Sequence, residues 1–113
     1  MQVLFESRSP EAVALRGMAV RRTRFVMRRL HWMVPRARVH LDDVNGPRGG
    51  VDKRCRIELS AAAGEPVVVT SMATDWRRAL DAALARAARA LLRLWQRQRQ
   101  RTRPAPDRSP PPR

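Results

Sequence analysis

Two short segments of the sequence, 36–42 and 54–59, alternate strictly between apolar and polar residues. Successive side chains of a β-strand point to opposite faces, so this period of two predicts strands with one buried and one exposed face. The apolar positions are Ala37, Val39, Leu41, Cys55, Ile57 and Leu59. Such strands form a sheet that is covered on one side only.

A short strand is expected over Met1–Glu6. A further strand is expected over Val67–Thr70, which consists of β-branched residues. The glycine-rich stretch from Asp42 to Asp52 predicts a loop. These glycines give only weak support for a nucleotide-binding loop, because no Gly-Lys-Ser/Thr follows and no helix is expected to begin there.

Helix-start signals occur twice. Ser9 suits an N-cap and is followed by Pro10 and Glu11, which predicts a helix that continues to about His31. Either Thr74 or Asp75 caps a second helix, which continues to about Gln100.

The order β-α-β-β-β-α predicts an α+β two-layer sandwich. A helical crossover makes the first two strands parallel, and short links make the remaining pairs antiparallel. We therefore expect a four-stranded mixed sheet with two roughly parallel helices on one face. This domain covers residues 1–100, and the basic, proline-rich residues 101–113 are expected to be a disordered tail.

The charge balance indicates a polyanionic partner. The chain has 113 residues and a formal net charge of +14. All of its positive side chains except Lys53 are arginines, which pair with phosphate through two parallel hydrogen bonds. An anionic membrane surface is the second partner class.

The second predicted helix separates its apolar and basic residues. At about 100° per residue, its leucines, several alanines, Trp76 and Trp95 share one arc, which makes both tryptophans core residues. The opposite arc holds Arg78, Arg86, Arg89, Arg93 and Arg97. Like charges at this spacing repel one another, and an anionic partner would relieve that repulsion.

The first predicted helix is less regular. Its apolar stripe, with Met18, Phe25 and Trp32 beside it, is interrupted by Arg22 and Arg29. Three further arginines point outward and extend the basic surface: Arg21, Arg24 and Arg28. The strand arginines lie on the other face of the sheet and are expected to be ordinary exposed residues: Arg36, Arg38, Arg54 and Arg56.

Other function classes find little support. Cys55 is the only cysteine, and His40 and Cys55 point to opposite faces of the sheet, so neither a disulfide nor a metal site is expected. No nucleophile set or cofactor loop is recognisable, so we expect neither enzyme activity, a small-molecule substrate nor a cofactor. No signal peptide or membrane span is recognisable, so the cytoplasm is the expected compartment.

Several segments together resemble a known family. They are the loop and strand "DDVNGPRGGVDKRCRIEL", the strand "EPVVVTS" and the helix opening "DWRRALDAALARAARAL". With the element order, these segments resemble the short ribosome hibernation factors of the HPF/RaiA family, also called ribosomal subunit interface or sigma-54 modulation proteins. The resemblance covers roughly residues 1–100.

The resemblance implies a stress-response factor that binds the small ribosomal subunit through 16S rRNA. Such a factor covers the transfer RNA and messenger RNA sites and inhibits translation without catalysis. The implied RNA contacts are Arg86, Arg89, Arg93 and Arg97 on the second helix, Arg22 on the first, and Lys53 and Arg54 after the loop. Arg78, in the same row, completes the predicted RNA-binding set.

Two alternatives stay open at this point. One is a general RNA-binding protein of the same fold, and the other is a protein that uses its amphipathic second helix on a membrane surface or a partner helix. A monomer is expected off the ribosome, because the two-layer core uses all the apolar faces.

Overall fold

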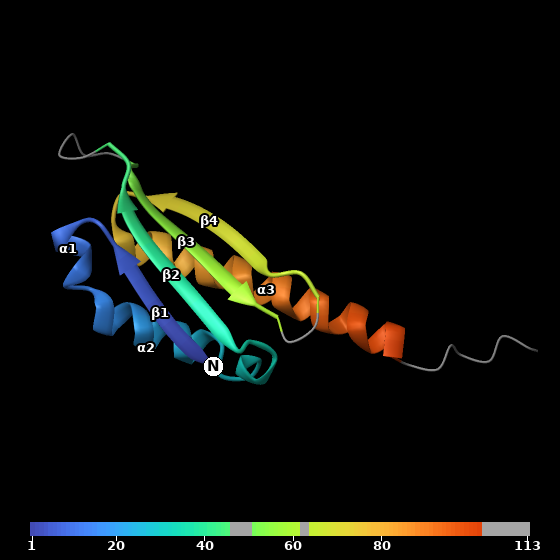
Figure 1. Cartoon of the computed structure of the whole chain (residues 1–113). Helices are drawn as coiled ribbons and strands as arrows, with labels where there is room; N and C mark the ends of the chain where they lie inside the picture. Colours follow the sequence, from blue (N-terminus) through green and yellow to red (C-terminus); the bar gives the residue numbers. More distant parts are fainter. Residues whose placement is uncertain (46–50, 62–63, 103–113) are drawn as a thin grey trace, which may run out of the picture.

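The computed structural model describes residues 1–45, 51–61 and 64–102 (Figure 1). Its elements follow the predicted order: β1 Gln2–Ser7, α1 Pro10–Val13, α2 Arg16–Val26, the 3-10 turn η1 His31–Met33, β2 Arg36–Asp43, β3 Lys53–Ser60, β4 Val67–Ala73 and α3 Trp76–Thr102. Residues 103–113 of the predicted tail lie outside the described residues, and α3 continues two residues beyond the predicted end at Gln100.

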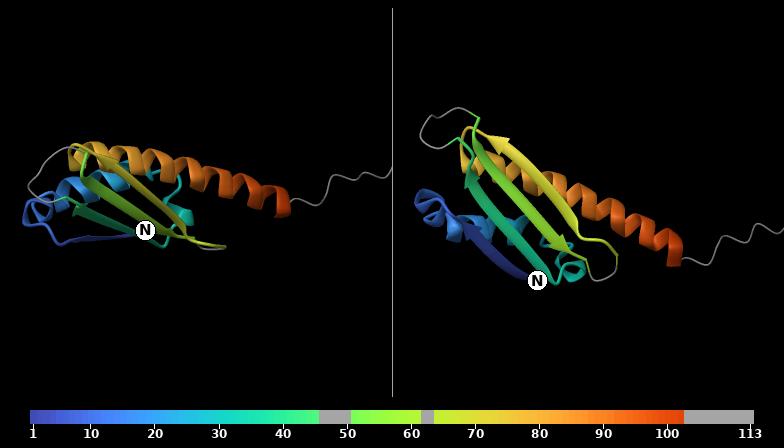
Figure 2. Two further views of the ribbon diagram at one scale, coloured as in Figure 1. Left: turned by 90° about the horizontal axis from the view of Figure 1, so that it is seen from above. Right: turned by 45° about the horizontal axis from the view of Figure 1, so that its top comes forward.

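The four strands form one mixed sheet in the order β1-β2-β3-β4. β1 pairs with β2 in parallel, and the two other pairs are antiparallel, as predicted. The register aligns Val39 with Phe5 on one side and with Ile57 on the other. Helices α2 and α3 cover one face and run in roughly the same direction, so the predicted α+β sandwich is confirmed (Figures 1 and 2).

The core lies between this face and the helices. All six apolar positions that the strand alternation predicted are fully buried, together with Leu80, Leu84 and Leu91 of α3. Trp76 is also buried, and its indole N–H donates a hydrogen bond of 3.0 Å to the carbonyl oxygen of Asp42, which joins the start of α3 to the end of β2. Burial raises the pKa of the Cys55 thiol to about 12, so this residue is a structural apolar side chain.

The N-terminus of α3 follows one of the two predicted caps. The Oδ1 atom of Asp75 accepts a hydrogen bond of 2.8 Å from the backbone N–H of Arg78, so Asp75, and not Thr74, is the N-cap. Ser9 occupies the N-cap position of α1, but its hydroxyl group donates to the carboxylate of Glu11 and caps no backbone N–H.

The prediction of one continuous first helix to about His31 was wrong. The chain forms the single turn α1, then α2, which ends at Val26, and then η1. Both Met27 and Met33 are buried. On an uninterrupted helix, at about 100° per residue, they would point about 120° apart, so a tighter turn is needed to return Met33 to the core.

Two aromatic residues lie outside the core. Phe25 and Trp32 accompany the predicted apolar stripe of the first helix, yet they are 64% and 60% exposed. Phe25 belongs to the outward side of α2, because the buried residues of this helix are Ala19 and Thr23.

Helix α3 is much longer than the sheet that supports it. Its 27 residues span about 40 Å at about 1.5 Å per residue, whereas the strands have six to eight residues. Trp95 is the last apolar residue of α3, and it packs against the core. The helix therefore projects beyond the sheet at its C-terminal end (Figure 2).

Candidate nucleic-acid interface

Positive charge is concentrated in the helical layer. Helix α2 carries four arginines and no acidic residue, and α3 carries eight arginines and one acidic residue, Asp81. The four strands together carry five Lys or Arg residues and four Asp or Glu residues. The helical layer is therefore strongly basic, and the sheet is close to neutral.

The five predicted arginines of α3 are all exposed: Arg78, Arg86, Arg89, Arg93 and Arg97. Within the part of the chain that the structure describes, the side chains of Arg89, Arg93 and Arg97 form no ion pair or hydrogen bond. Their side chains are therefore available to an anionic partner.

Two members of this row also have local roles. The Nη1 group of Arg86 donates a hydrogen bond of 2.6 Å to the carbonyl oxygen of Thr70, on the edge strand β4. Arg78 forms an ion pair of 3.4 Å with the capping residue Asp75. Arg86 thus also attaches α3 to the sheet.

A groove of about 590 Å³ lies where β4 begins beside the later turns of α3. Arg93 and Arg97 contribute to its lining, together with residues 64–68 and Gln98. The two arginines therefore border a concave surface at the β4 edge of the sheet.

Arg22 interrupts the apolar stripe of the first helix because it pairs with the second. Its Nε group donates to the Oδ1 atom of Asp81 at 2.5 Å, and both side chains are partly exposed. This ion pair links α2 to α3. No local sequence pattern indicates this pair, because Arg22 and Asp81 are far apart in the chain.

Lys53 and Arg54 are neighbours in the sequence, but β3 points them to opposite faces. Lys53 lies on the helical side, with Nζ 2.8 Å from Asp43, 3.4 Å from the buried Asp52 and 5.0 Å from the centre of the Trp76 ring. The hydrogen bond to Asp43 is the main cause of the raised pKa of Lys53. The two aspartates largely offset its charge.

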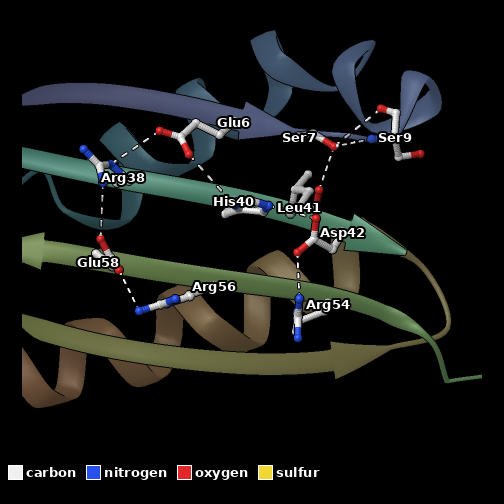
Figure 3. Close-up of polar contacts among 10 residues, drawn as sticks. All are labelled: Glu6, Ser7, Ser9, Arg38, His40, Leu41, Asp42, Arg54, Arg56 and Glu58. Carbon is white, nitrogen blue, oxygen red and sulfur yellow. Dashed lines mark hydrogen bonds and ion pairs between the residues drawn. The ribbon is translucent and has the colours of Figure 1, made fainter. Parts of the chain in front are cut away.

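Arg54 belongs to a network of alternating charges on the open face of the sheet (Figure 3). Its Nη2 group lies 2.8 Å from Oδ2 of Asp42, whose Oδ1 atom lies 2.8 Å from Nε2 of His40. On the same face, Glu58 pairs with Arg56 at 2.8 Å and with Arg38 at 3.8 Å. The charges of this network offset one another, so this face presents no continuous basic surface.

The open-face network predicts a loss of stability in acid that depends on Asp42. Burial raises the pKa of this carboxyl group and is the largest single cause, but the hydrogen bonds from Arg54 and His40, together with the attraction of their charges, outweigh it and leave the pKa below its usual 3.8. Asp42 therefore stabilises the fold above about pH 4, and this contribution is lost as the pH falls through the folded-state pKa. In urea unfolding, Asp42→Asn should be less stable than wild type at pH 7, and the difference should shrink at pH 3. An equal difference at both pH values would contradict this assignment.

Some basic residues of the helical layer are missing from the predicted set. Arg21, which was expected only to extend the basic surface, and Arg77, which was not considered, line a small pocket between α2 and the start of α3. The pocket also contains Phe25. An arginine on one helix has no sequence signal that pairs it with an aromatic residue on another, so only the fold reveals this group.

No helix in the described ranges has the length and apolar character needed to cross a membrane. Within residues 1–45, 51–61 and 64–102, no cluster of three or more His, Cys, Asp or Glu side chains is placed to hold a metal ion.

Comparison with solved structures supports the fold. A ribosomal subunit interface protein from Coxiella burnetii aligns with a TM-score of 0.68 and 12% identity, over 85% of this chain and 99% of that one. The N-terminal domain of Protein Y from Thermus thermophilus aligns with a TM-score of 0.59 and 20% identity, over 83% of this chain and 99% of that one. No protein-family model and no curated protein matches the sequence. The fold that the resemblance implied is confirmed.

Proposed function

We propose that the protein is a ribosome-associated translation inhibitor that docks on the small ribosomal subunit through phosphates of its 16S rRNA. The observation that carries this proposal is the strongly basic helical layer, on a fold shared with a ribosomal subunit interface protein. The bound protein would cover the transfer RNA and messenger RNA sites. Inhibition would be steric, with no chemical step, substrate or cofactor.

The row on α3 is the main contact surface in this proposal. Arg78 and Arg97 lie 19 positions apart, about 29 Å along the helix, which is long enough to meet several phosphates. Guanidinium groups on a rigid helix recognise the spacing of phosphates and the shape of folded RNA without reading its sequence. Each phosphate contact releases counterions, so binding should weaken steeply as the salt concentration rises.

The other predicted contacts have different positions in this proposal. Arg22 is close to the helical face, and its exposed side can meet a phosphate while Asp81 holds it. Lys53, in β3, lies beside Trp76 at the start of α3, and Asp43 and Asp52 reduce its attraction for RNA. Arg54 is on the open face, so it contacts RNA only if the partner also reaches that side.

Sedimentation through a sucrose gradient tests the proposal. The purified protein is run with small subunits, large subunits and intact ribosomes, at low and at near-physiological salt. We expect it to remain with small subunits and intact ribosomes at the higher salt. Loss of all binding at the higher salt would contradict the proposal.

General RNA binding is the second candidate, because contacts to phosphate alone would suit any folded RNA. It predicts equal affinity for small subunits and for an unrelated structured RNA at matched salt, whereas the ribosomal proposal predicts a preference for small subunits. Membrane binding through the apolar side of α3 is disfavoured. That side is packed on the sheet, with Leu84 and Trp76 buried.

A further inference from the structure

The small pocket between α2 and the start of α3 combines an aromatic ring with arginines. It has a volume of about 330 Å³ and is lined by Met18, Arg21, Arg22, Phe25 and Arg77. Phe25 is 64% exposed. This ring contributes little to the fold, because most of its surface stays in water.

The charge of the pocket is positive and only partly offset. Arg22 is held by Asp81, which fixes one guanidinium group at the junction of the two helices. Across the described residues, Arg21 and Arg77 form neither an ion pair nor a side-chain hydrogen bond. Two arginines that line the pocket with the exposed ring, Arg21 from α2 and Arg77 from α3, are thus free to bind anions.

The Phe25 ring already stacks with a flat group. The guanidinium carbon of Arg28 lies 4.2 Å from the ring centre, while Nη1 of Arg28 donates to the carbonyl oxygen of Phe25 at 2.8 Å. Such planar contacts on an aromatic face are favourable in water. The ring can therefore be approached face-on by a planar ligand.

We propose that this pocket binds one unpaired RNA base, stacked on Phe25, with the neighbouring phosphates at Arg21 and Arg77. The inference deepens the proposed function, on which it rests, because it identifies unpaired nucleotides as a second element of RNA recognition beside the phosphate contacts of α3. A base can displace Arg28 from the ring, and the released guanidinium can then pair with a phosphate.

The chemistry of the pocket favours an unpaired nucleotide over other anions. The flat faces of bases are accessible in loops and single strands, whereas a duplex stacks them internally. A nucleotide within a strand also joins a flat base to two neighbouring phosphates, which matches a pocket that holds one aromatic ring and two unpaired arginines. The pocket volume is near the lower end of about 300–1,000 Å³ for small-ligand sites, which suits one planar group.

Substitutions at Phe25 separate stacking from charge and from general hydrophobicity. Stacking on an aromatic residue contributes about 1–3 kcal/mol per base, so Phe25→Ala should weaken binding of a short oligoadenylate about 5- to 150-fold. Phe25→Leu, which keeps apolar volume without a ring, should lose nearly as much, and Phe25→Trp should bind at least as well as wild type. Affinity for an RNA duplex of matched phosphate number should not change.

Three outcomes would overturn the proposal. They are wild-type affinity of Phe25→Leu for oligoadenylate, an equal loss on single strand and duplex, and a Phe25-dependent binding to phosphatidylserine vesicles with unchanged oligoadenylate binding. Circular dichroism of each variant checks that the fold is kept. Small-subunit sedimentation is run in parallel. If wild type fails to bind subunits while oligoadenylate binding depends on Phe25, the pocket assignment stands and the ribosomal function fails.

Discussion

Substituting glutamine for Arg89, Arg93 and Arg97 together should weaken binding to small ribosomal subunits about a hundredfold to a thousandfold at about 0.1 M salt. Each lost phosphate contact should also reduce the slope of log affinity against log salt by about 0.7–0.9. These three side chains are chosen because they form no ion pair or hydrogen bond within the described part of the chain. Arg86 is left in place because it also bonds to the β4 edge.

The matched control removes the same charge from the other side of the molecule. Arg8, Arg36 and Arg56 are exposed, and Arg8 and Arg56 line the hollow of the open sheet face. Their triple glutamine variant should keep near-wild-type affinity and salt dependence. If both triple variants weaken binding equally, the effect comes from net charge alone, and the assignment of the helical face is wrong. Arg54→Gln, measured separately, tests whether the partner reaches the open face.

Leu84→Ala should lower the free energy of unfolding by about 2–5 kcal/mol, the range for a fully buried leucine that leaves a cavity. Leu84 is completely buried where α3 packs on the sheet. A domain of this size has only about 5–15 kcal/mol of net stability, so this change is a large part of the total. Urea unfolding, followed by circular dichroism, measures the effect.

Leu92→Ala provides the comparison for Leu84→Ala within the same helix. Leu92 is 40% exposed, so its truncation removes less buried surface and should cost less than 1 kcal/mol, on the order expected from about 25 cal/mol per Å². Similar losses for the two variants would mean that α3 does not pack on the sheet through the face described above.

The sheet and α3 could be predicted in detail because their signals are local. Alternation at 36–42 and 54–59 identified the buried face, and every apolar position in these segments is fully buried. The first helix could not be predicted as well. It ends at Val26 because the chain must then turn to bring Met33 back to the core. This is a requirement of tertiary packing, and the helical periodicity of the sequence does not reveal it.

In the candidate site, too, features set by local sequence patterns could be predicted and features set by tertiary packing could not. The periodicity of α3 predicted that its arginine row is exposed, because one helix sets all those positions. The partners of Arg22, Lys53 and Arg54 could not be predicted, because Asp81, Asp43 and Asp42 reach them only through packing and strand register. The exposure of Phe25 was missed because an aromatic residue beside an apolar stripe usually packs with it.

Because α3 projects beyond the sheet, the stability of the fold and the distance over which the basic surface extends depend on different parts of this helix. No apolar residue follows Trp95 within α3, so shortening the projecting end of the helix by a turn should have little effect on whether the domain folds. The same change would move charges near the end of the helix, such as Arg97 and Arg99, by about 5 Å relative to the rest of the basic surface. The length of the projecting part of α3 therefore determines how far the molecule extends along a partner, and it can change while the sheet stays the same.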